Sequence, residues 1–543
     1  MARLNGGRAV AHALRAEGIE VVFGIVGTHN VQIFDGLHGV PELRVVTTRH
    51  EQGAGFMADG YARASGRIAA CVVVPGPGLT NVMTPLGQAY SDSVPLLAIT
   101  GQNPRGRLDR RLEDFHELHE SVAIAGSVTA RAARVDSAAD VPAAIREAVR
   151  VMRSGRPRPT FLEVPMDILG GEEDVEMLPP AEDYPRPLGS SEGIKRAAGL
   201  LGGARRPIVV AGGGVISAEG SEALREVAER LGAPVITTCH GKGAIPDDHP
   251  LAVGDGWGRL TFFDELFAQA DACLAVGTRF DVVTDFRQGA GLPDPLVHVD
   301  IDANVINQLR SATIGIVGDA RIVLERLRDE LGGDAQENSW CDVEAVRAKK
   351  RQALLEVAGP AVRLVEAIRS VLPRDAIVVD DLCLPGYWAV PALDVYEPRT
   401  FLHPGTYGTL GFALPAAIGA QIGRPDRRVV ALCGDGGFLY TSQELATAVQ
   451  EAANMVAIVF NDNAFGALKL FQDRHLGGRR IGVELHNPDF AQLAEAYGAR
   501  GIKLRASSEL GPALSAALDE AKPAVIECPL DFPQSTAPPP WMP

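Results

Sequence analysis

Short apolar runs alternate with helix-like segments throughout the first 170 residues of the chain. Each run ends in glycine or polar residues, and the next segment repeats its apolar positions at helical spacing. Strands that alternate with helices in this way form a parallel sheet with helices on both faces. The apolar runs that predict these strands span residues 21–26, 43–47, 69–74 and 96–100.

The same alternation recurs in two further regions of the chain. Strands are predicted at 206–211, 234–238, 272–276 and 297–301, and then at 376–379, 429–433 and 456–460. Between these regions lie an acidic, proline-rich linker at 171–190 and a second linker at 332–358 with a charged helical piece. The sequence therefore predicts an α/β fold of three Rossmann-like, doubly wound parallel-sheet domains, at residues 1–170, 191–335 and 359–530.

Composition and charge exclude some classes of binding partner for this protein. The 543 residues carry a net charge of −16, which argues against nucleic acid and anionic membranes. No apolar run approaches the ~20 residues of a membrane span, and the N-terminus lacks the apolar core of a secretory signal. The seven cysteines are scattered without a CxxC pair, as in reduced proteins. We expect a cytoplasmic protein with no nucleic-acid and no membrane partner, acting on a small molecule.

Polar oxygen atoms follow two neighbouring predicted strands in the third domain. Gly434-Asp435-Gly436 ends the first strand, and Asn461-Asp462-Asn463 ends the second, with 24 residues between Gly436 and Asn461. Backbone N–H groups at a glycine turn and a helix N-terminus bind phosphates. Carboxylate and amide oxygens are the ligands that Mg²⁺ prefers. The alternative is an ordinary strand–helix–strand crossover whose polar residues merely end the strands.

This spacing resembles the signature of thiamine diphosphate (ThDP) enzymes, in which GDG is followed after about two dozen residues by Asn-Asn. The resemblance implies that Asp435, Asp462 and the backbone carbonyl of Ala464 bind Mg²⁺. Asp462 replaces the second Asn, which keeps an oxygen ligand and adds a negative charge. The resemblance further implies that the cofactor contacts the residues around the motif, namely Gly434, Asp435, Gly436, Gly437, Asp462, Ala464, Phe465 and Gly466.

The segment HEQGAGFMADGYARASG, which contains Glu51, closely resembles the glutamate segment of acetolactate synthases and 2-oxoacid decarboxylases. The resemblance implies that the Glu51 carboxylate contacts the aminopyrimidine ring of ThDP. There it would favour the imino tautomer that removes the proton from C2 of the thiazolium. Taken alone, a glutamate at a helix start is more often a favourable interaction with the helix dipole.

Three more residues are catalytic candidates, two of them at a predicted strand end and the third by the same resemblance. Thr28 and His29 follow the first strand, and His116 lies in Phe115-His116-Glu117, where acetolactate synthases have Phe-Gln-Glu. Each could contact substrate or transfer a proton, although a solvated surface segment would show the same residues. The His116-x-x-His119 pair could suggest a bound metal, but no third histidine has suitable spacing, so we do not expect one.

A glycine-rich segment before an alanine-rich helix completes the predicted cofactor site. Gly408-Thr409-Leu410-Gly411 resembles the GTMG or GGLG segment of the same branch, which implies that Gly408 and Leu410 contact ThDP. Leu410 would hold the cofactor in the bent shape that brings its amino group to C2. A simple core role for Leu410 remains the alternative.

The central region resembles the domain of acetolactate synthases that binds FAD. Its Gly212-Gly213-Gly214 turn is not the spaced GxGxxG of dinucleotide sites, so FAD is the less favoured addition to ThDP and Mg²⁺. The tail at 535–543 is too rich in proline for a helix, and either disorder or a lid over the site would fit it.

The resemblance covers the whole chain. It implies an N-terminal domain that binds the ThDP pyrimidine, a central domain, and a C-terminal domain that binds the diphosphate and Mg²⁺. It further implies a homodimer or homotetramer with active sites between subunits, and a lyase or transferase that decarboxylates a 2-oxoacid, joins it to a second carbonyl, or does both. A relative that has lost activity is the non-catalytic alternative, which the intact Glu51 disfavours.

The match to acetolactate synthase itself is imperfect, because Phe471 and Pro75 stand where those enzymes carry tryptophan and serine. Benzoylformate decarboxylases carry a histidine where this chain has Val74, although their helix segment resembles residues 410–419. Guanidino-oxoacid decarboxylases resemble the chain around Glu51 and at 115–117. A non-oxidative decarboxylase of either type and a flavin-dependent 2-oxoacid oxidase are the alternatives to an acetolactate synthase-like enzyme.

Overall fold

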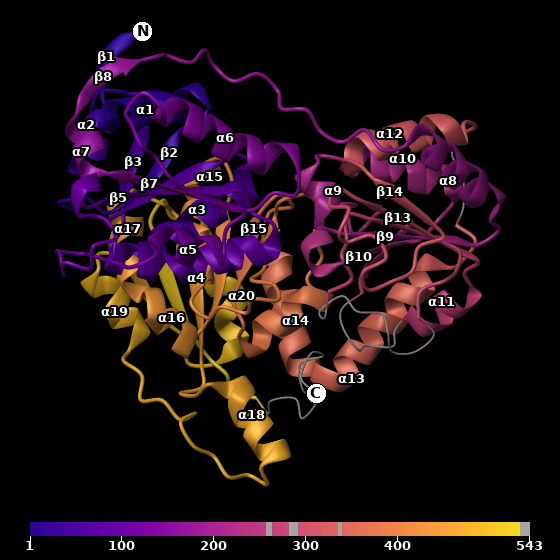
Figure 1. Cartoon of the computed structure of the whole chain (residues 1–543). Helices are drawn as coiled ribbons and strands as arrows, with labels where there is room; N and C mark the ends of the chain where they lie inside the picture. The colour runs from indigo at the N-terminus through magenta and orange to yellow at the C-terminus, as the bar shows by residue number, and fades with distance from the viewer. Residues whose placement is uncertain (257–262, 282–290, 335–338, 533–543) are drawn as a thin grey trace.

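The computed structural model describes residues 1–256, 263–281, 291–334 and 339–532. Figure 1 shows the N-terminal domain stacked on the C-terminal domain, with the central domain beside them. Each domain contains a six-stranded sheet in which every pair of neighbouring strands is parallel, so the predicted fold class is confirmed. Among the described residues, no helix combines the length and apolar character needed to cross a membrane.

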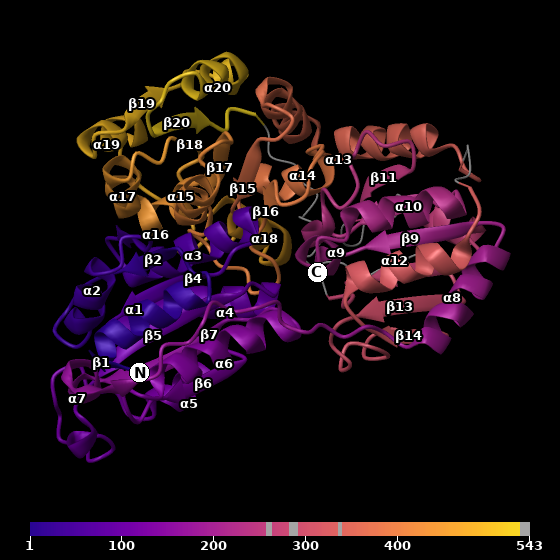
Figure 2. The same cartoon turned by 90° about the horizontal axis from the view of Figure 1, so that it is seen from above.

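The N-terminal sheet has the strand order β3-β2-β4-β5-β7-β6, and helices cover both of its faces (Figure 2). Its strands are β2 (Val21–Gly24), β3 (Arg44–Thr47), β4 (Ala69–Val73), β5 (Leu96–Gln102), β6 (Arg131–Arg134) and β7 (Thr160–Pro165). Its helices are α1 (Gly6–Ala16), α2 (Val31–His38), α3 (Glu51–Ser65), α4 (Pro77–Asp92), η1 (Arg105–Arg107), α5 (Ser121–Gly126), α6 (Val141–Ser154) and α7 (Met166–Gly170).

A small antiparallel sheet closes the N-terminal domain. β1 (Ala2–Asn5) pairs with β8 (Glu172–Val175), so the start of the chain is tied to the segment that follows the last helix of the domain. The sequence predicts a linker from residue 171, and its lack of periodicity hid this short strand. Beyond β8 the chain crosses to the central domain as an extended segment (Figure 1).

The central sheet has the order β11-β10-β9-β12-β13-β14. A Cβ added to Gly212 or Gly214 would lie 2.2 or 2.6 Å from backbone atoms of Gly277. These glycines are therefore required where the turns after β9 and β12 touch. The strands are β9 (Pro207–Ala211), β10 (Val235–Thr237), β11 (Ala252–Asp255), β12 (Ala272–Val276), β13 (Leu296–Asp300) and β14 (Ile314–Val317). The helices are α8 (Ser191–Gly203), α9 (Gly213–Ser217), α10 (Ser221–Leu231), η2 (Cys239–Gly241), α11 (Asp264–Gln269) and α12 (Ala320–Leu331).

The C-terminal sheet has the order β16-β15-β17-β18-β20-β19. The long helix α13 (Val343–Val371) enters this domain and has a non-helical residue, Ala358, two residues before Pro360, where the ring excludes a regular helix. Residues 343–358 of the predicted second linker thus form the first half of this helix. The strands are β15 (Ile377–Asp380), β16 (Phe401–Leu402), β17 (Val429–Gly434), β18 (Val456–Asn461), β19 (Arg500–Lys503) and β20 (Ala524–Pro529). The remaining helices are α14 (Leu384–Ala392), α15 (Ala413–Gly423), α16 (Asp435–Thr441), η4 (Ser442–Glu444), α17 (Leu445–Gln450), α18 (Gly466–His475), α19 (Phe490–Ala496), η5 (Ser507–Glu509) and α20 (Leu510–Leu518). The tail that could form a lid lies outside the described residues.

One hydrophobic core joins the N-terminal and C-terminal domains. Helices α3 and α15 pack against each other there, and the rings of Phe56 and Phe412 meet edge to face at 5.6 Å. The two backbones approach closely at two glycines. A Cβ on Gly60 would lie 2.0 Å from the carbonyl oxygen of Ala416, and one on Gly419 would lie 1.9 Å from that of Met57. This packing fixes the orientation of α3, which begins at Glu51.

Candidate active site

Glu51 begins α3 at the strand-end edge of the N-terminal sheet. Its half-buried carboxylate accepts a hydrogen bond of 2.9 Å from Asn81 Nδ2, and Asn81 lies in the first turns of α4. The tight turn before α4 makes this approach feasible, because Gly76 adopts φ 58 and a Cβ there would touch the backbone of His116 at 2.7 Å. The carboxylate and the segment containing His116 therefore meet at one edge of the sheet.

The His29 side chain is buried, and its hydrogen bond to Asn103 defines the tautomer of the neutral ring. The amide of Asn103 is oriented by its Nδ2, which donates to the carbonyl oxygen of Phe115 at 3.2 Å. Its Oδ1 therefore faces His29 Nε2 at 3.0 Å and accepts a hydrogen bond from the Nε2–H group. In the neutral ring Nδ1 then carries a lone pair, and within the described part of the chain this buried atom has no hydrogen-bond partner.

The ring of His116 stacks on that of His29, with centroids 5.2 Å apart. Burial and the neighbouring His29 lower the pKa of His116, while the Glu51 carboxylate acts in the opposite direction. Its buried Nδ1 likewise has no hydrogen-bond partner among the described residues. Two stacked imidazoles therefore each have an unsatisfied ring nitrogen, and His116 is near enough to Glu51 for that carboxylate to act on its pKa.

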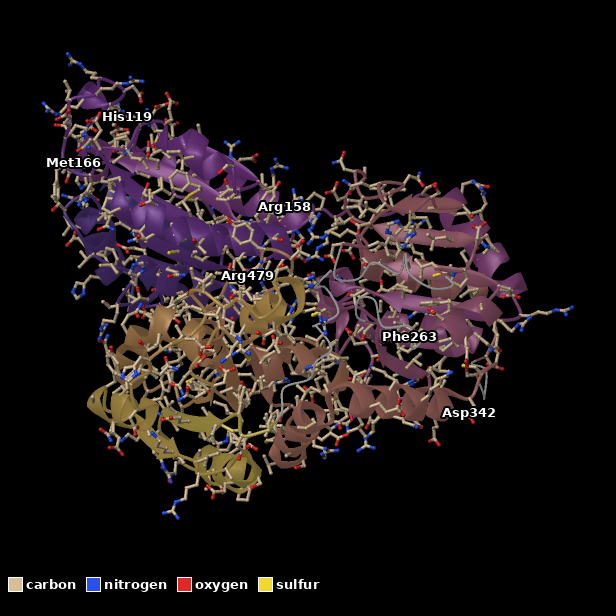
Figure 3. All side chains as sticks on the ribbon, turned by 90° about the horizontal axis from the view of Figure 1, so that it is seen from below. His119, Arg158, Met166, Phe263, Asp342 and Arg479 are labelled. Atoms are coloured by element: carbon tan, nitrogen blue, oxygen red, sulfur yellow. The ribbon has the colours of Figure 1, made fainter. Side chains whose placement is uncertain are left out.

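Thr28 and His119, the remaining candidates in the N-terminal domain, are more exposed than His29 and His116. Thr28 is exposed next to His29. Figure 3 shows His119 at the outer end of the N-terminal domain, and its imidazole is 55% exposed. Across the described ranges, no group of three or more His, Cys, Asp or Glu side chains is arranged to hold a metal, so the His116-x-x-His119 pair forms no such cluster.

The two motif segments of the C-terminal domain meet where β17 and β18 end side by side. Asp435 Oδ2 accepts the backbone N–H of Ala464 at 3.2 Å, which joins the first residue of α16 to the turn after β18. Its other oxygen accepts the N–H of Gly436 at 2.8 Å. A Cβ on Gly466 would lie 2.5 Å from Asp462 Oδ2, so the start of α18 packs directly against the second carboxylate.

Burial disfavours the ionised forms of both Asp435 and Asp462, and the charge of Asp435 disfavours that of Asp462 further. Burial and the neighbouring Asp435 raise the pKa of Asp462 to about 6, and burial raises that of Asp435. Two partly buried neighbouring carboxylates form a suitable donor set for a divalent cation, whose charge would stabilise their ionised forms. The residues present therefore fit Mg²⁺.

Asn487 completes this carboxylate cluster, and sequence reasoning missed it. Its Nδ2 donates to Asp435 Oδ2 at 2.7 Å and to Asn461 Oδ1 at 3.0 Å. Its own Oδ1 is buried and has no hydrogen bond among the described residues. Asn487 is followed by Pro488 in a surface turn, so the sequence shows only an ordinary loop residue.

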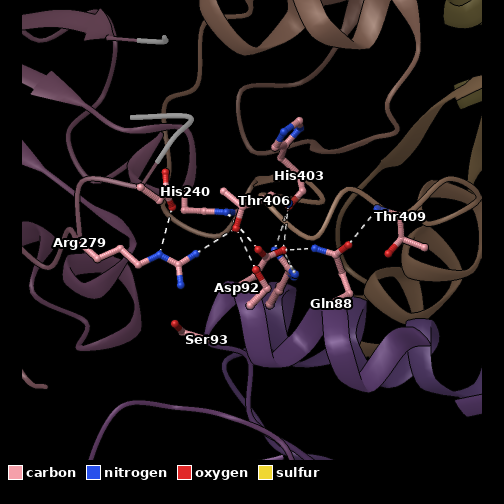
Figure 4. A network of polar contacts seen from close by, with 12 residues as sticks. Gln88, Asp92, Ser93, His240, Arg279, His403, Thr406 and Thr409 are labelled. Carbon is pink, nitrogen blue, oxygen red and sulfur yellow. Dashed lines mark hydrogen bonds and ion pairs between the residues drawn. The ribbon is translucent and has the colours of Figure 1, made fainter. Parts of the chain in front are cut away.

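The loop at 403–411, which contains Leu410, is held between all three domains (Figure 4). Gly408 and Gly411 have φ of 70 and 80, which favours glycine, and Leu410 between them is partly exposed. Asp381 Oδ2 accepts the N–H of Gly411 at 2.9 Å. Burial raises the pKa of Asp381 to about 7. Asp381 follows the predicted strand at 376–379, but nothing in the sequence indicates its contact with this loop.

The C-terminal turns of α4 hold the other end of this loop. Gln88 Oε1 accepts the N–H of Thr409 at 3.2 Å, and Asp92 Oδ2 accepts that of Gly405 at 3.0 Å. Asp92 is also 3.5 Å from the His240 imidazole of the central domain. Residues from the N-terminal and central domains therefore decide where Leu410 lies.

Arginine side chains lie at the border between the central and N-terminal domains. Arg156 lies 3.9 Å from Asp302, and Arg158 marks the same border in Figure 3. Arg279 Nη2 donates to Thr406 Oγ1 at 3.3 Å, which connects the central domain to the Leu410 loop. The Arg279–Thr406 contact therefore holds the Leu410 loop from the central domain, in addition to the contacts from α4.

Three family models match the chain in the order of its domains. Residues 4–124 match the N-terminal TPP-binding domain of thiamine pyrophosphate enzymes, residues 194–327 their central domain, and residues 383–528 their C-terminal TPP-binding domain. A probable 2-ketoarginine decarboxylase of Pseudomonas aeruginosa is 39% identical over 96% of this chain and 94% of its own. The chain belongs to the thiamine pyrophosphate enzymes.

Other relatives in this family of thiamine pyrophosphate (thiamine diphosphate) enzymes bear a different name. The acetolactate synthase large subunit of Corynebacterium glutamicum is 34% identical over 97% of this chain and 86% of its own. A probable acetolactate synthase large subunit of Methanocaldococcus jannaschii is also 34% identical, over 97% of this chain and 92% of its own. The protein is thus a ThDP-dependent enzyme, and its two matched TPP-binding domains contain Glu51 and the Asp435–Asp462 pair respectively.

Proposed function

We propose that this enzyme decarboxylates a 2-oxoacid with ThDP and Mg²⁺ and releases the corresponding aldehyde. The observation that carries this proposal is the stack of His29 and His116 beside Glu51, with ring centroids 5.2 Å apart. Release of an aldehyde requires a proton at the former carbonyl carbon, and imidazoles are the side chains best suited to deliver it near neutral pH. Joining to a second carbonyl does not need that proton.

Bound ThDP supplies a nucleophilic carbon and an acceptor for the electrons left by CO₂. Asp435, Asp462 and the carbonyl oxygen of Ala464 would hold Mg²⁺, which in turn binds the diphosphate. The other residues proposed to contact the cofactor are Gly434, Gly436, Gly437, Phe465, Gly466, Gly408 and Leu410. Glu51 would hydrogen-bond the aminopyrimidine and so favour its imino tautomer, which would supply a base next to C2.

The two histidines would then transfer protons to and from the substrate. The lone pair on His29 Nδ1, fixed by the bond from Nε2 to Asn103, can accept a proton or a hydrogen bond. The lowered pKa of His116 keeps it largely neutral near pH 7, so it can pass a proton on rather than hold it. Thr28, exposed beside His29, is the remaining candidate for substrate contact.

We infer that a second copy of the chain completes each site. Glu51 and Asp435 lie on separate domains, and apolar side chains near both are exposed. Phe115 is 68% exposed, Val26 51% and Tyr440 48%. A partner that places its C-terminal domain against this N-terminal domain would cover these side chains and bring the two halves of the site together.

A panel of 2-oxoacids with product identification tests the proposed activity. The full-length protein, supplied with ThDP and Mg²⁺, is incubated with pyruvate, benzoylformate and a guanidino-2-oxoacid, and CO₂, aldehyde and acyloin are measured. Aldehyde in proportion to CO₂ is the expected result. Acyloin as the main product would instead indicate a carboligase. Oxygen consumption by a protein with flavin absorbance would indicate an oxidase, and no CO₂ from any member of a broad panel would refute the proposal.

A further inference from the structure

A glutamate of the C-terminal domain is buried against the segment that precedes Glu51. Glu444 is the last residue of η4 and is fully buried. Its Oε1 accepts the backbone N–H of His50 at 2.9 Å, and both of its oxygens lie 3.2 Å from that of Arg49. Thr447 Oγ1 donates to Oε2 at 2.7 Å. The positive charge of Arg49 also acts on this carboxylate and opposes the rise of its pKa that burial causes.

These contacts place a negative charge at the N-terminus of α3. The first N–H groups of a helix have no partner within the helix and carry its positive dipole end, so a nearby carboxylate stabilises that end. His50, the N-cap residue, satisfies one group through its own ring, since Nδ1 accepts the N–H of Gln52 at 3.1 Å. Glu444 acts on the two residues just before the helix, and it does so from another domain.

Gly53 shows how closely the carboxylate approaches. A Cβ at this position would lie 2.2 Å from Glu444 Oε1 and 2.5 Å from Cδ. Gly53 is helical, so its backbone conformation does not require glycine. The glycine after Glu51-Gln52 is instead explained by the space that the Glu444 side chain fills.

The short segment from Asp435 to Glu444 therefore connects the proposed Mg²⁺ site with the backbone that precedes Glu51. Asp435 begins α16 in the carboxylate cluster, and Glu444 ends η4 against the backbone that precedes Glu51. Both ends are buried, and the first residue after η4, Leu445, belongs to the core shared by the two domains. A displacement of this segment moves the start of α3 with it.

We propose that Glu444 is a positioning residue for Glu51: its carboxylate caps the N-terminus of α3 from the C-terminal domain and fixes the backbone from which the Glu51 side chain reaches the cofactor. This inference rests on the proposed role of Glu51. Glu444 itself touches neither substrate nor cofactor in this assignment. Its effect reaches the chemistry only through the Arg49–Glu51 backbone.

Two variants and a matched control separate this role from general stability. Glu444→Gln keeps the shape of the side chain and removes its charge, whereas Gly53→Ala forces the carboxylate away and leaves it charged. Glu451→Gln is the control, because Glu451 also bridges the two domains, through Arg44 at 2.8 Å, but makes no hydrogen bond to the Arg49–Glu51 backbone among the described residues. All three are made in the full-length protein.

Two measurements are needed on each variant. The first is amide hydrogen exchange of residues 48–56, without and with ThDP and Mg²⁺. The second is hydrogen–deuterium exchange at C2 of bound ThDP, alongside the Kd for ThDP. Glu444→Gln and Gly53→Ala should speed amide exchange at Arg49 and His50 and slow C2 exchange by about tenfold or more, the effect of losing a charge-assisted hydrogen bond. The Kd for ThDP should stay within about threefold. Glu451→Gln should match the wild type in both measurements, because its partner is the Arg44 side chain rather than the backbone before Glu51.

The outcomes distinguish this inference from the proposed function. A wild-type protein that binds ThDP without C2 exchange would refute the function and, with it, the positioning role. Normal C2 exchange in both the wild type and Glu444→Gln would overturn the positioning role alone. Unchanged amide exchange at Arg49 and His50 in Glu444→Gln would overturn the capping contact. An equal loss in Glu451→Gln would show that any bridge between these domains has the same effect, which also overturns the inference.

Discussion

Asn81 Nδ2 donates a hydrogen bond of 2.9 Å to Glu51 Oε2, so α4 orients the carboxylate that begins α3. Asn81→Ala should leave ThDP binding nearly unchanged and slow C2 exchange by about tenfold, because a hydrogen bond to a charged group contributes about 1.5–3 kcal/mol. Exchange is followed by NMR after acid quench. Asn304→Ala, at an exposed turn of the central domain, is the control. A wild-type exchange rate in Asn81→Ala would contradict an orienting role.

Asp462 should make both stability and Mg²⁺ binding depend on pH. Its pKa is raised to about 6, so between pH about 4 and 6 the folded chain binds more protons than the unfolded chain. Without metal, the free energy of unfolding should therefore fall as pH rises through this range. Mg²⁺ binds the ionised form, so its affinity should rise over the same range.

Asp462→Asn should remove the Asp462 contribution to the pH dependence of unfolding and most of the pH dependence of Mg²⁺ binding, while other buried carboxylates with a raised pKa, such as Asp381, keep their contribution to unfolding. Urea unfolding of the metal-free protein and calorimetric titration with Mg²⁺, both from pH 4.5 to 7.5, provide the measurements. Asp329→Asn, at an exposed position, should keep the wild-type profile. If Asp462→Asn retained the wild-type slopes, the raised pKa would have to be assigned to another residue.

His116→Gln should shift the products from aldehyde toward acyloin. Loss of a general acid costs about 10²–10⁴-fold in the proton-transfer step, so a second carbonyl would compete better for the same carbon. Gas chromatography with pyruvate plus an added aldehyde measures the ratio. His119→Gln is the control, because that imidazole is largely exposed.

The product ratio should also depend on pH. Burial and His29 lower the pKa of His116 below its usual 6.5, so its protonated form accumulates only in more acidic solution. The aldehyde share of the wild type should rise as pH falls below about 6.5, and that of His116→Gln should not. Parallel profiles for the two proteins would remove His116 from the proton transfer.

Gly60→Ala should destabilise the joint core of the N-terminal and C-terminal domains. The new Cβ would lie 2.0 Å from the Ala416 carbonyl oxygen, so α3 and α15 must separate, and such overpacking costs about 1–3 kcal/mol. Urea unfolding measures the loss. Gly199→Ala in α8 has open space around its Cβ and should be neutral or stabilising by about 0.5–1 kcal/mol. Equal stabilities of the two variants would contradict the close helix contact.

The sequence by itself determined the fold class and the identity of the cofactor. Buried parallel strands are continuous apolar runs, and their ends carry the turns and polar groups that bind a cofactor, so both signals are local. For this reason the β17 and β18 ends and the Glu51 segment are recognisable without a structure. The short strand β8 was not, because it pairs with β1 from the far end of the domain and has no pattern of its own.

Only the tertiary structure decided which groups fix the site residues in place. Asn487 meets Asp435 across 52 residues, and Glu444 meets Arg49 across 395. A residue of any type can donate its backbone N–H, so such a hydrogen bond cannot be predicted from the donor's identity. A glutamate that becomes buried cannot be distinguished in the sequence from one that stays at the surface. The sequence names residues with suitable chemistry, whereas packing of the two domains determines which of them come together and what charge each retains.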